Sequence, residues 1–270
     1  SKTIKEMSKK FQLSKSEHLK LSKYCEKKGI IYLCSAFDLD SLKYLVKKLR
    51  VPIIKIPSGE ILSTDMLEFA SKFKGQVFLS TGMSSLNDIK KSLAILKKKN
   101  IILLHCVSLY PTAYDEVNLN NLKLLRNKFK LKVGFSDHTK DELASLTAAS
   151  MGISVLEKHV TLSNKMQGPD HKSSLKIEKF AKLIKKIRLI EKIKGSNTRS
   201  ITNEEKKIKD CVRKSIVAKI FLPKGLKLKK KHVTFKRPGT GINPIELKFY
   251  LGKKIIKPIE KDFLLKKDNF

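Results

Sequence analysis

The sequence predicts an α/β protein, a (β/α)8 TIM barrel that lacks its first two βα units and is followed by a small, mostly β domain. Three observations predict it. Six short apolar runs of β type alternate with helix-like segments, an order that builds a parallel sheet through right-handed crossovers. No glycine-rich nucleotide fingerprint follows any run, which disfavours a doubly wound nucleotide-binding sheet. A polar segment then separates this part from a shorter β-type part.

The apolar runs predict six strands. They are residues 30–35, 53–56, 77–80, 101–106, 133–136 and 155–159. Since a closed barrel of this type needs eight strands, two βα units are expected to be missing before the first run. An open barrel exposes strand edges and apolar core. We therefore interpret the chain as an N-terminally truncated or fragmentary product.

Helix signals fill the intervals between the predicted strands. Ser84 and Ser85 can cap a helix that continues through Lys99. Apolar residues at 177, 180, 184 and 187 repeat at helical spacing and predict a helix that ends before Gly195.

Three segments are expected along the chain. The partial barrel covers residues 1–195, and the polar, aperiodic residues 196–211 form a linker. Residues 212–270 form the small second domain, with β runs, a Pro-Lys-Gly turn and a glycine-rich loop at residues 237–241.

The chain of 270 residues is strongly basic, with 59 Lys and Arg against 25 Asp and Glu, a formal net charge of +34. The basic residues are nearly all lysine and are spread over every predicted helix, whereas nucleic-acid recognition favours clustered arginine. We expect a solvated lysine surface, no specific nucleic-acid partner and no membrane span. The four cysteines form no CxxC pair and no secretory leader opens the chain, which indicates reduced thiols and a cytoplasmic protein.

Polar residues follow several predicted strands, where a barrel carries its active site. Lys55 alternates with apolar neighbours, and Ser58 comes just after that strand. Ser80 ends the next strand, beside a glycine and ahead of a helix. Lysine, hydroxyl groups and a helix N-terminus predict a cradle for phosphate or carboxylate.

Two histidines end neighbouring strands and are candidate ligands for a shared metal ion. His138 follows residues 133–136, and His159 ends residues 155–159. In an extended chain Glu157 points to the same side as His159, into the barrel, and Lys158 points outward. Two imidazoles with a nearby carboxylate leave open positions for water and substrate, as in a catalytic metal site.

Structural roles remain open for the same residues. The histidines can be structural, and the serines can cap helices, as can Asp137. Lys55 can instead be the Schiff-base lysine of an aldolase-type barrel.

Several motifs in order resemble the sialic acid synthase family, the N-acetylneuraminate synthases and their relatives. They are KIPSGEI, LSTGM, LLHCVSLYPTAYDEVNL, VGFSDHT, EKHVTL followed by GPDHKSS, and RPGTGI. The resemblance implies a TIM barrel joined to a small antifreeze-like (SAF) domain, in a domain-swapped homodimer. It also implies condensation of phosphoenolpyruvate with an N-acetylated amino sugar, such as N-acetylmannosamine, to a nine-carbon 2-keto acid plus phosphate.

The resemblance also implies roles for individual residues. Mn²⁺, or Mg²⁺ or Co²⁺ in its place, is expected on His138 and His159, with Glu157 ordering a metal-bound water. Phosphoenolpyruvate is expected to bind to Lys55, Ser58, Ser80, Ser108 and Ser136. The sugar is expected to contact Tyr110 and Asp170, and its N-acetyl group is expected to contact Arg237 from the partner subunit.

The start of the chain departs from the family. The two opening strands that supply a glutamate near the metal, a lysine and a glutamine are absent. Legionaminate and pseudaminate synthases of the same family are alternatives, and an inactive basic remnant is a further, non-enzymatic one.

Overall fold

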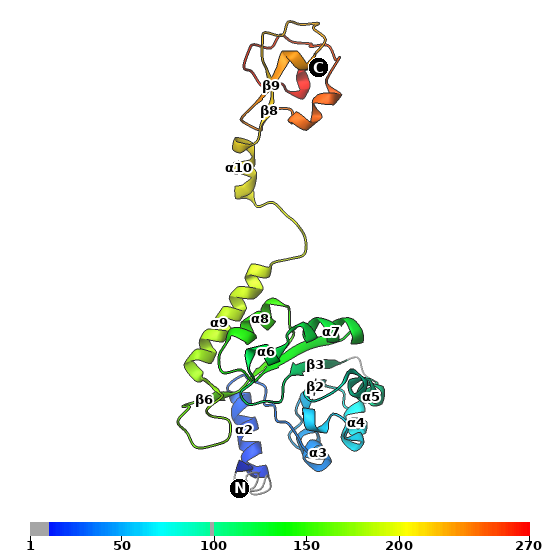
Figure 1. The fold of residues 1–270 in the computed structure, drawn as a ribbon, viewed down its shortest axis with the longest axis vertical. Coiled ribbons are helices and arrows are strands. Elements are labelled where there is room, and N and C mark those ends of the chain that lie inside the picture. The colour runs from blue at the N-terminus through cyan, green and yellow to red at the C-terminus, as the bar shows by residue number, and fades with distance from the viewer. Residues whose placement is uncertain (1–10, 98–99) are drawn as a thin grey trace. The chain divides into compact units, whose positions relative to one another are not determined.

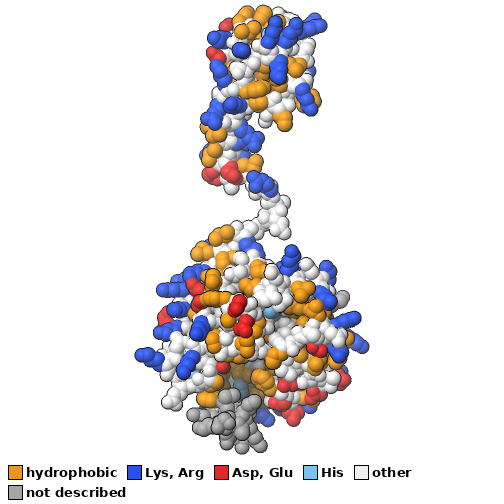
Figure 2. Space-filling view, viewed as in Figure 1, with side chains coloured by type: hydrophobic (Ala, Val, Ile, Leu, Met, Phe, Trp, Pro, Cys, Tyr) orange, Lys and Arg blue, Asp and Glu red, His pale blue; other side chains and the backbone are white. Residues whose placement is uncertain are grey.

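The structure is a computed structural model that describes residues 11–97 and 100–270. The chain divides into two compact units, Ser1–Gly195 and Ser196–Phe270 (Figure 1). On the face that Figure 2 shows, Lys and Arg side chains are scattered over each unit. Across the described residues, every helix is too short or too polar to cross a bilayer.

The first unit is built on a parallel sheet of five strands in the order β1-β2-β3-β4-β5 (Figure 1). The strands are β1 (Ile53–Ile56), β2 (Gln76–Ser80), β3 (Ile101–Cys106), β4 (Lys132–Asp137) and β5 (Leu156–Lys158). Each strand pairs with the next one along the chain, so each crossover returns beside the strand it left. The structure therefore has the partial barrel that the alternating pattern predicts.

Helices lie before, between and after the strands. In chain order they are α2 (Lys15–Lys27), α3 (Leu39–Lys47), α4 (Thr64–Ser71), α5 (Leu86–Leu96), α6 (Tyr114–Val117), α7 (Asn120–Phe129), α8 (Leu143–Ser150) and α9 (Ile177–Lys194). The main core lies between α3 to α8 and the outer face of the strands, and its fully buried members include Ile54, Leu79 and Leu103, whereas α2 has no buried residue.

Alternation along each strand sends the other side chains to the inner face. There a small apolar cluster of Phe78, Ile102 and Leu104 fills the part nearer the amino ends. The inner face nearer the carboxyl ends carries polar residues instead, and these form the candidate site.

The predicted strand at residues 30–35 is wrong. Only Ser35 pairs with the sheet, through a single bridge to Lys55. Ile30 and Ile31 are about 60% exposed. A strand requires a continuous ladder of backbone partners, which this apolar run does not make with β1.

Several other boundaries differ from the predictions. β2 begins one residue earlier, at Gln76, and β4 is longer by one residue at each end. β5 ends at Lys158, so His159 lies between β5 and a short parallel pair, β6 (Val160–Thr161) and β7 (Leu175–Lys176). α5 starts after Ser85, whose side chain accepts a hydrogen bond from the amide of Asp88, and Lys97 ends it in a left-handed conformation with φ of 47°. The rest of the expected helix, residues 98–99, lies outside the described part of the chain.

The second unit contains less regular β structure than expected. It begins with α10 (Asn203–Val212), which occupies the second half of the predicted linker, runs one residue past it and is capped by Thr202. Two antiparallel strands follow, β8 (Ser215–Ala218) and β9 (Val233–Lys236), with the 3-10 segments η2 (Lys230–His232), η3 (Pro244–Phe249) and η4 (Lys267–Asn269). Isolated bridges close an apolar core of its own around Ile216 and Leu222.

Candidate active site

The inner face of the sheet brings polar side chains of β1, β4 and β5 together. Lys55 Nζ donates to Glu157 Oε1 at 2.7 Å, and Ser136 Oγ donates to the same oxygen at 2.6 Å. Register explains the second contact, because Ser136 and Glu157 are opposed across β4 and β5. The first contact joins residues of the first and last strands of the sheet.

Glu157 is held as a carboxylate. Burial raises its pKa, but the charge and hydrogen bond of Lys55 and the hydrogen bond from Ser136 outweigh burial, so the pKa lies below the ordinary value of 4.5. The site therefore presents a fixed negative oxygen paired with a fixed positive amine.

His138 is oriented by the loop that follows β3. Its Nδ1 lies 2.6 Å from the carbonyl oxygen of Val107, which can only accept, so Nδ1 carries the proton. Burial lowers the pKa of His138 below 6.5, which favours the neutral ring. Nε2 then presents a lone pair, 3.2 Å from the oxygen of Ser136, whose hydrogen is given to Glu157.

His159 completes a cluster of three rings with His138 and Tyr110. The two imidazole centres are 5.4 Å apart at an interplanar angle of 82°. The Tyr110 ring lies 4.1 Å from His138 and 5.4 Å from His159. Asp170 Oδ2 lies 3.8 Å from His159 Nδ1, and burial, with the nearby Asp170 and Glu157 carboxylates, raises the pKa of Tyr110.

The centres of the two imidazoles are spaced as in a pair of rings that binds one divalent ion. Rings bound to one ion at about 2.1 Å have centres roughly 5 Å apart, close to the 5.4 Å found here. Within residues 11–97 and 100–270 no group of three or more His, Cys, Asp or Glu is arranged around one point. Such an ion would therefore take its other ligands from water and substrate, as catalytic rather than structural sites do.

Hydroxyl groups gather beside β2. The amide of Gly82 donates to Ser58 Oγ at 3.0 Å, and Ser58 Oγ lies 3.3 Å from Cys106 Sγ. A Cβ added to Gly82 would lie 2.5 Å from Ser108 Oγ and 2.9 Å from Ser58 Oγ, so glycine lets both hydroxyls approach the turn.

Ser80 ends β2 on the inner face and is 3% exposed. Among the described residues, its hydroxyl is the buried side-chain group that lacks a hydrogen-bond partner. Leaving a hydroxyl in that state costs free energy, which a ligand that accepts its hydrogen recovers. The orphan hydroxyl fits the predicted anion cradle.

Arg237 belongs to the second unit. Its Nε donates to the carbonyl of Val212 at 2.8 Å. Next to it, Ser215 Oγ donates to the carbonyl of Pro238 and accepts from the amide of Gly241, so the ends of the glycine-rich loop are tied to β8.

Sequence reasoning missed three contributors to the site. These are the carbonyl of Val107, Cys106 and Thr112, whose amide donates to the carbonyl of His138 at 3.0 Å. Period-2 alternation along residues 101–106 could have placed Cys106 on the inner face, where the structure shows it opposite Ser136. Backbone groups leave no residue-type signal.

Known proteins are similar to this chain in sequence and in fold. The NeuB family model matches residues 1–199. The chain belongs to the NeuB family. It is similar to the N,N'-diacetyllegionaminic acid synthase of Campylobacter jejuni, with 39% identity over 266 residues that cover 97% of this chain and 79% of that protein. It is 31% identical over 265 residues to the human N-acetylneuraminate-9-phosphate synthase, covering 97% of this chain and 74% of that protein.

A solved structure agrees with this membership. The N-acetylneuraminic acid synthetase of Leptospira borgpetersenii serovar Hardjo-bovis superposes with a TM-score of 0.71 and 33% identity, covering 75% of this chain and 72% of that one. The resemblance to sialic acid synthases is thus confirmed for this NeuB chain, which is shorter than these relatives.

Proposed function

We propose that this chain condenses phosphoenolpyruvate with an N-acetylated amino sugar, such as N-acetylmannosamine, to a nine-carbon 2-keto sugar acid and phosphate. One observation carries the proposal: in a NeuB chain, two imidazoles 5.4 Å apart adjoin a carboxylate fixed by Lys55 and Ser136. A divalent ion such as Mn²⁺, held by His138 and His159, would polarise the aldehyde of the open-chain sugar.

The chain's own residues supply the binding chemistry. Phosphoenolpyruvate carries a phosphate and a carboxylate, and a cradle of one ammonium and several hydroxyls matches both. Its members would be Lys55, Ser58, Ser80, Ser108 and Ser136. Because Lys55 is already paired with Glu157, an arriving anion would share this amine with that carboxylate.

The reaction then needs one C–C bond and one added water. The methylene carbon of phosphoenolpyruvate attacks the aldehyde carbon, which becomes an alcohol, and water adds to the resulting cation at C2. Glu157, an ionised acceptor, would orient this water and take its proton, and the former aldehyde oxygen would receive that proton as it becomes the alcohol. Phosphate leaves with cleavage of the C–O bond, which gives a ketone at C2.

The sugar would lie over the cluster of rings. Tyr110 and Asp170 flank His159 and present a phenol and a carboxylate to sugar hydroxyls. We extend the proposal to a domain-swapped homodimer, in which Arg237 of the partner subunit contacts the N-acetyl group.

Phosphate release tests the proposal. The chain is incubated with Mn²⁺, phosphoenolpyruvate labelled with ¹⁸O in the C–O–P bridge, and a panel of N-acetylmannosamine and the sugar precursors of legionaminic and pseudaminic acid. We expect phosphate that retains the label, released only with one class of sugar and abolished by chelation. Release without sugar, unlabelled phosphate, or no release with any sugar would contradict the proposal.

A Schiff-base aldolase using Lys55 is the alternative enzyme. The ion pair with Glu157 disfavours it, since a protonated, paired amine is a poor nucleophile. Borohydride reduction in the presence of a keto-acid substrate separates the two, because only the aldolase leaves a covalent adduct on Lys55. Salt-sensitive binding to polyanions without turnover would instead support the basic remnant.

A further inference from the structure

Each candidate metal ligand directly follows a member of one buried ion pair. Asp137 precedes His138 at the end of β4, and Lys158 precedes His159 at the end of β5. Asp137 and Lys158 are opposed in the register of the two strands. Their side chains leave the sheet on the outer face, and those of Ser136 and Glu157, one residue earlier, on the inner face.

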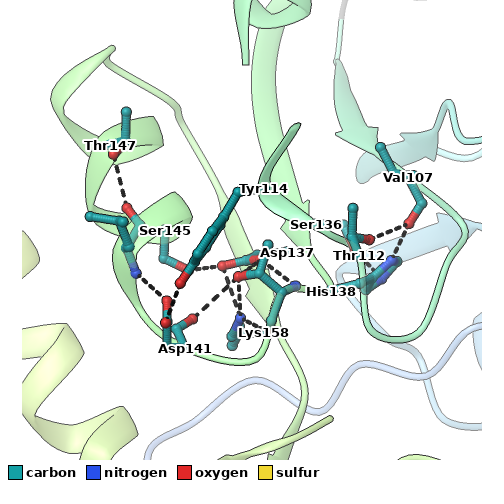
Figure 3. A network of polar contacts seen from close by, with 12 residues as sticks. Val107, Thr112, Tyr114, Ser136, Asp137, His138, Asp141, Ser145, Thr147 and Lys158 are labelled. Carbon is teal, nitrogen blue, oxygen red and sulfur yellow. Dashed lines mark hydrogen bonds and ion pairs between the residues drawn. The ribbon is translucent and has the colours of Figure 1, made fainter. Parts of the chain in front are cut away.

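The Asp137 carboxylate is saturated by its surroundings (Figure 3). Lys158 Nζ lies 2.9 Å from Oδ2, and Ser145 of α8 donates to the same oxygen. The amide and hydroxyl of Thr139 both donate to Oδ1 at 2.8 Å. One carboxylate thus ties together β4, β5, the loop after His138 and helix α8.

Lys158 is bound just as fully. Besides Asp137, its amine donates to the carbonyl oxygen of Thr139 at 2.6 Å and contacts the hydroxyl of that residue at 3.3 Å. Three acceptors match the three hydrogens of an ammonium group. Both side chains of the pair have zero exposure, so neither can touch a substrate on the inner face.

The two histidines depend on this pair to different degrees. His138 has its own anchors, because its ring bonds the Val107 carbonyl and its carbonyl accepts from Thr112. The carbonyl of His159 accepts from the amide of Leu175 at 2.9 Å, but its ring approaches Asp170 only at 3.8 Å, beyond a normal hydrogen bond. The main chain on either side of His159, at Lys158 and through Leu175, therefore sets where its ring lies.

We infer that Asp137 and Lys158 are positioning residues, which fix the ends of β4 and β5 so that the two imidazoles stay within reach of one divalent ion. This inference rests on the metal site of the proposed function, and it adds the buried pair behind the site. A buried ion pair is a weak source of stability compared with well-packed neutral groups of similar size. Its value here lies in fixing the geometry.

Manganese affinity of the full chain tests the inference. Free Mn²⁺ is followed by electron paramagnetic resonance during titration of the wild type and of the neutral double variant Asp137→Asn/Lys158→Met, which leaves no unpaired buried charge. We expect the dissociation constant to rise about tenfold or more, the effect typical of residues that orient metal ligands. Circular dichroism should show that the variant remains folded.

Two further variants keep the test decisive. Leu103→Ala lies in the main core, so it lowers the melting temperature without touching the pair, and its Mn²⁺ affinity should equal that of the wild type. Thr139→Val removes the hydroxyl shared by Asp137 and Lys158, and it should weaken Mn²⁺ binding several-fold even if the double variant fails to fold.

The inference is overturned if the folded double variant binds Mn²⁺ within twofold of the wild-type affinity. If the double variant does not fold, the same result for Thr139→Val overturns it. It is also overturned if the wild type binds no Mn²⁺, or if Leu103→Ala weakens binding as much as the pair variant does. Phosphate release reports separately, because a wild type that binds Mn²⁺ through this pair but releases no phosphate would refute only the proposed function.

Discussion

The amine of Lys55 and the carboxylate of Glu157 meet at 2.7 Å although 102 residues separate them in the chain. They come from β1 and β5, the first and last strands of the sheet. A flat five-stranded sheet would hold these strands about 19 Å apart, so this contact shows that the sheet curls about its inner face. The curl is what gathers the candidate site.

Replacing Lys55 should damage binding and stability together. Lys55→Met leaves the half-buried Glu157 with Ser136 as its remaining hydrogen-bond partner, which should cost roughly 1–3 kcal/mol of unfolding free energy. The pKa of Glu157 should rise, because burial remains while the main lowering influence is gone. Thermal unfolding without phosphoenolpyruvate measures the loss of stability, and the further stabilisation that phosphoenolpyruvate adds measures its binding. Lys43→Met, in an exposed pair with Asp40, is the matched control and should change neither.

Removing the Ser80 hydroxyl should move stability and binding in opposite directions. Ser80→Ala deletes a buried group that lacks a partner in the described residues, so unfolding free energy should stay level or rise by up to about 1 kcal/mol. Stabilisation by phosphoenolpyruvate should fall by about 1 kcal/mol, the worth of one hydrogen bond. A variant that is less stable, yet still bound by phosphoenolpyruvate as the wild type is, would show that Ser80 has a purely structural role.

Adding a methyl group at Gly82 should weaken the binding of phosphoenolpyruvate. In Gly82→Ala the new Cβ would press on the hydroxyls of Ser108 and Ser58, which would have to rotate away from the turn. We expect roughly tenfold weaker phosphoenolpyruvate binding, equal to about 1.4 kcal/mol, measured by calorimetry. Gly59→Ala is the control, since nothing lies within 4 Å of its added Cβ. Equal effects of the two substitutions would contradict the predicted cradle.

His138 should resist protonation. Burial lowers its pKa below 6.5 in the folded chain, so an unfolded chain takes up this proton first as the pH falls. The stabilising contribution is complete above about pH 6.5 and declines below it. Proton NMR, with His138→Gln to assign the signal, should give a midpoint below 6.5 in the metal-free protein. A midpoint at or above 6.5 would refute the buried, neutral ring.

Local pattern predicts two of the strands to the residue. β3 is an apolar run buried at every position, and β1 is buried at alternate positions, as a strand with one face on the core should be. The run at residues 30–35 has the same composition but no ladder partner, which sequence does not reveal. α10 escaped notice because its first five residues are all polar or charged, and its apolar residues Ile208, Cys211 and Val212 fall in its last five positions.

The candidate site likewise contains side chains whose direction the local pattern predicts and contacts that depend on the fold. Alternation places Glu157 inward and Lys158 outward, since it depends on the strand alone. The partner of Lys158 depends on the register between β4 and β5, and the tautomer of His138 depends on a backbone carbonyl of another loop. Such contacts arise from the fold and carry no residue-type signal.

The two histidines remain the centre of the account, and Mn²⁺ binding to them tests it most directly. Titration followed by electron paramagnetic resonance should give one tightly bound Mn²⁺ per wild-type chain, and the same in His18→Gln, whose imidazole bonds Tyr32 instead. The double variant His138→Ala/His159→Ala should lose this ion. Retention of one Mn²⁺ at wild-type affinity in the double variant would contradict the account.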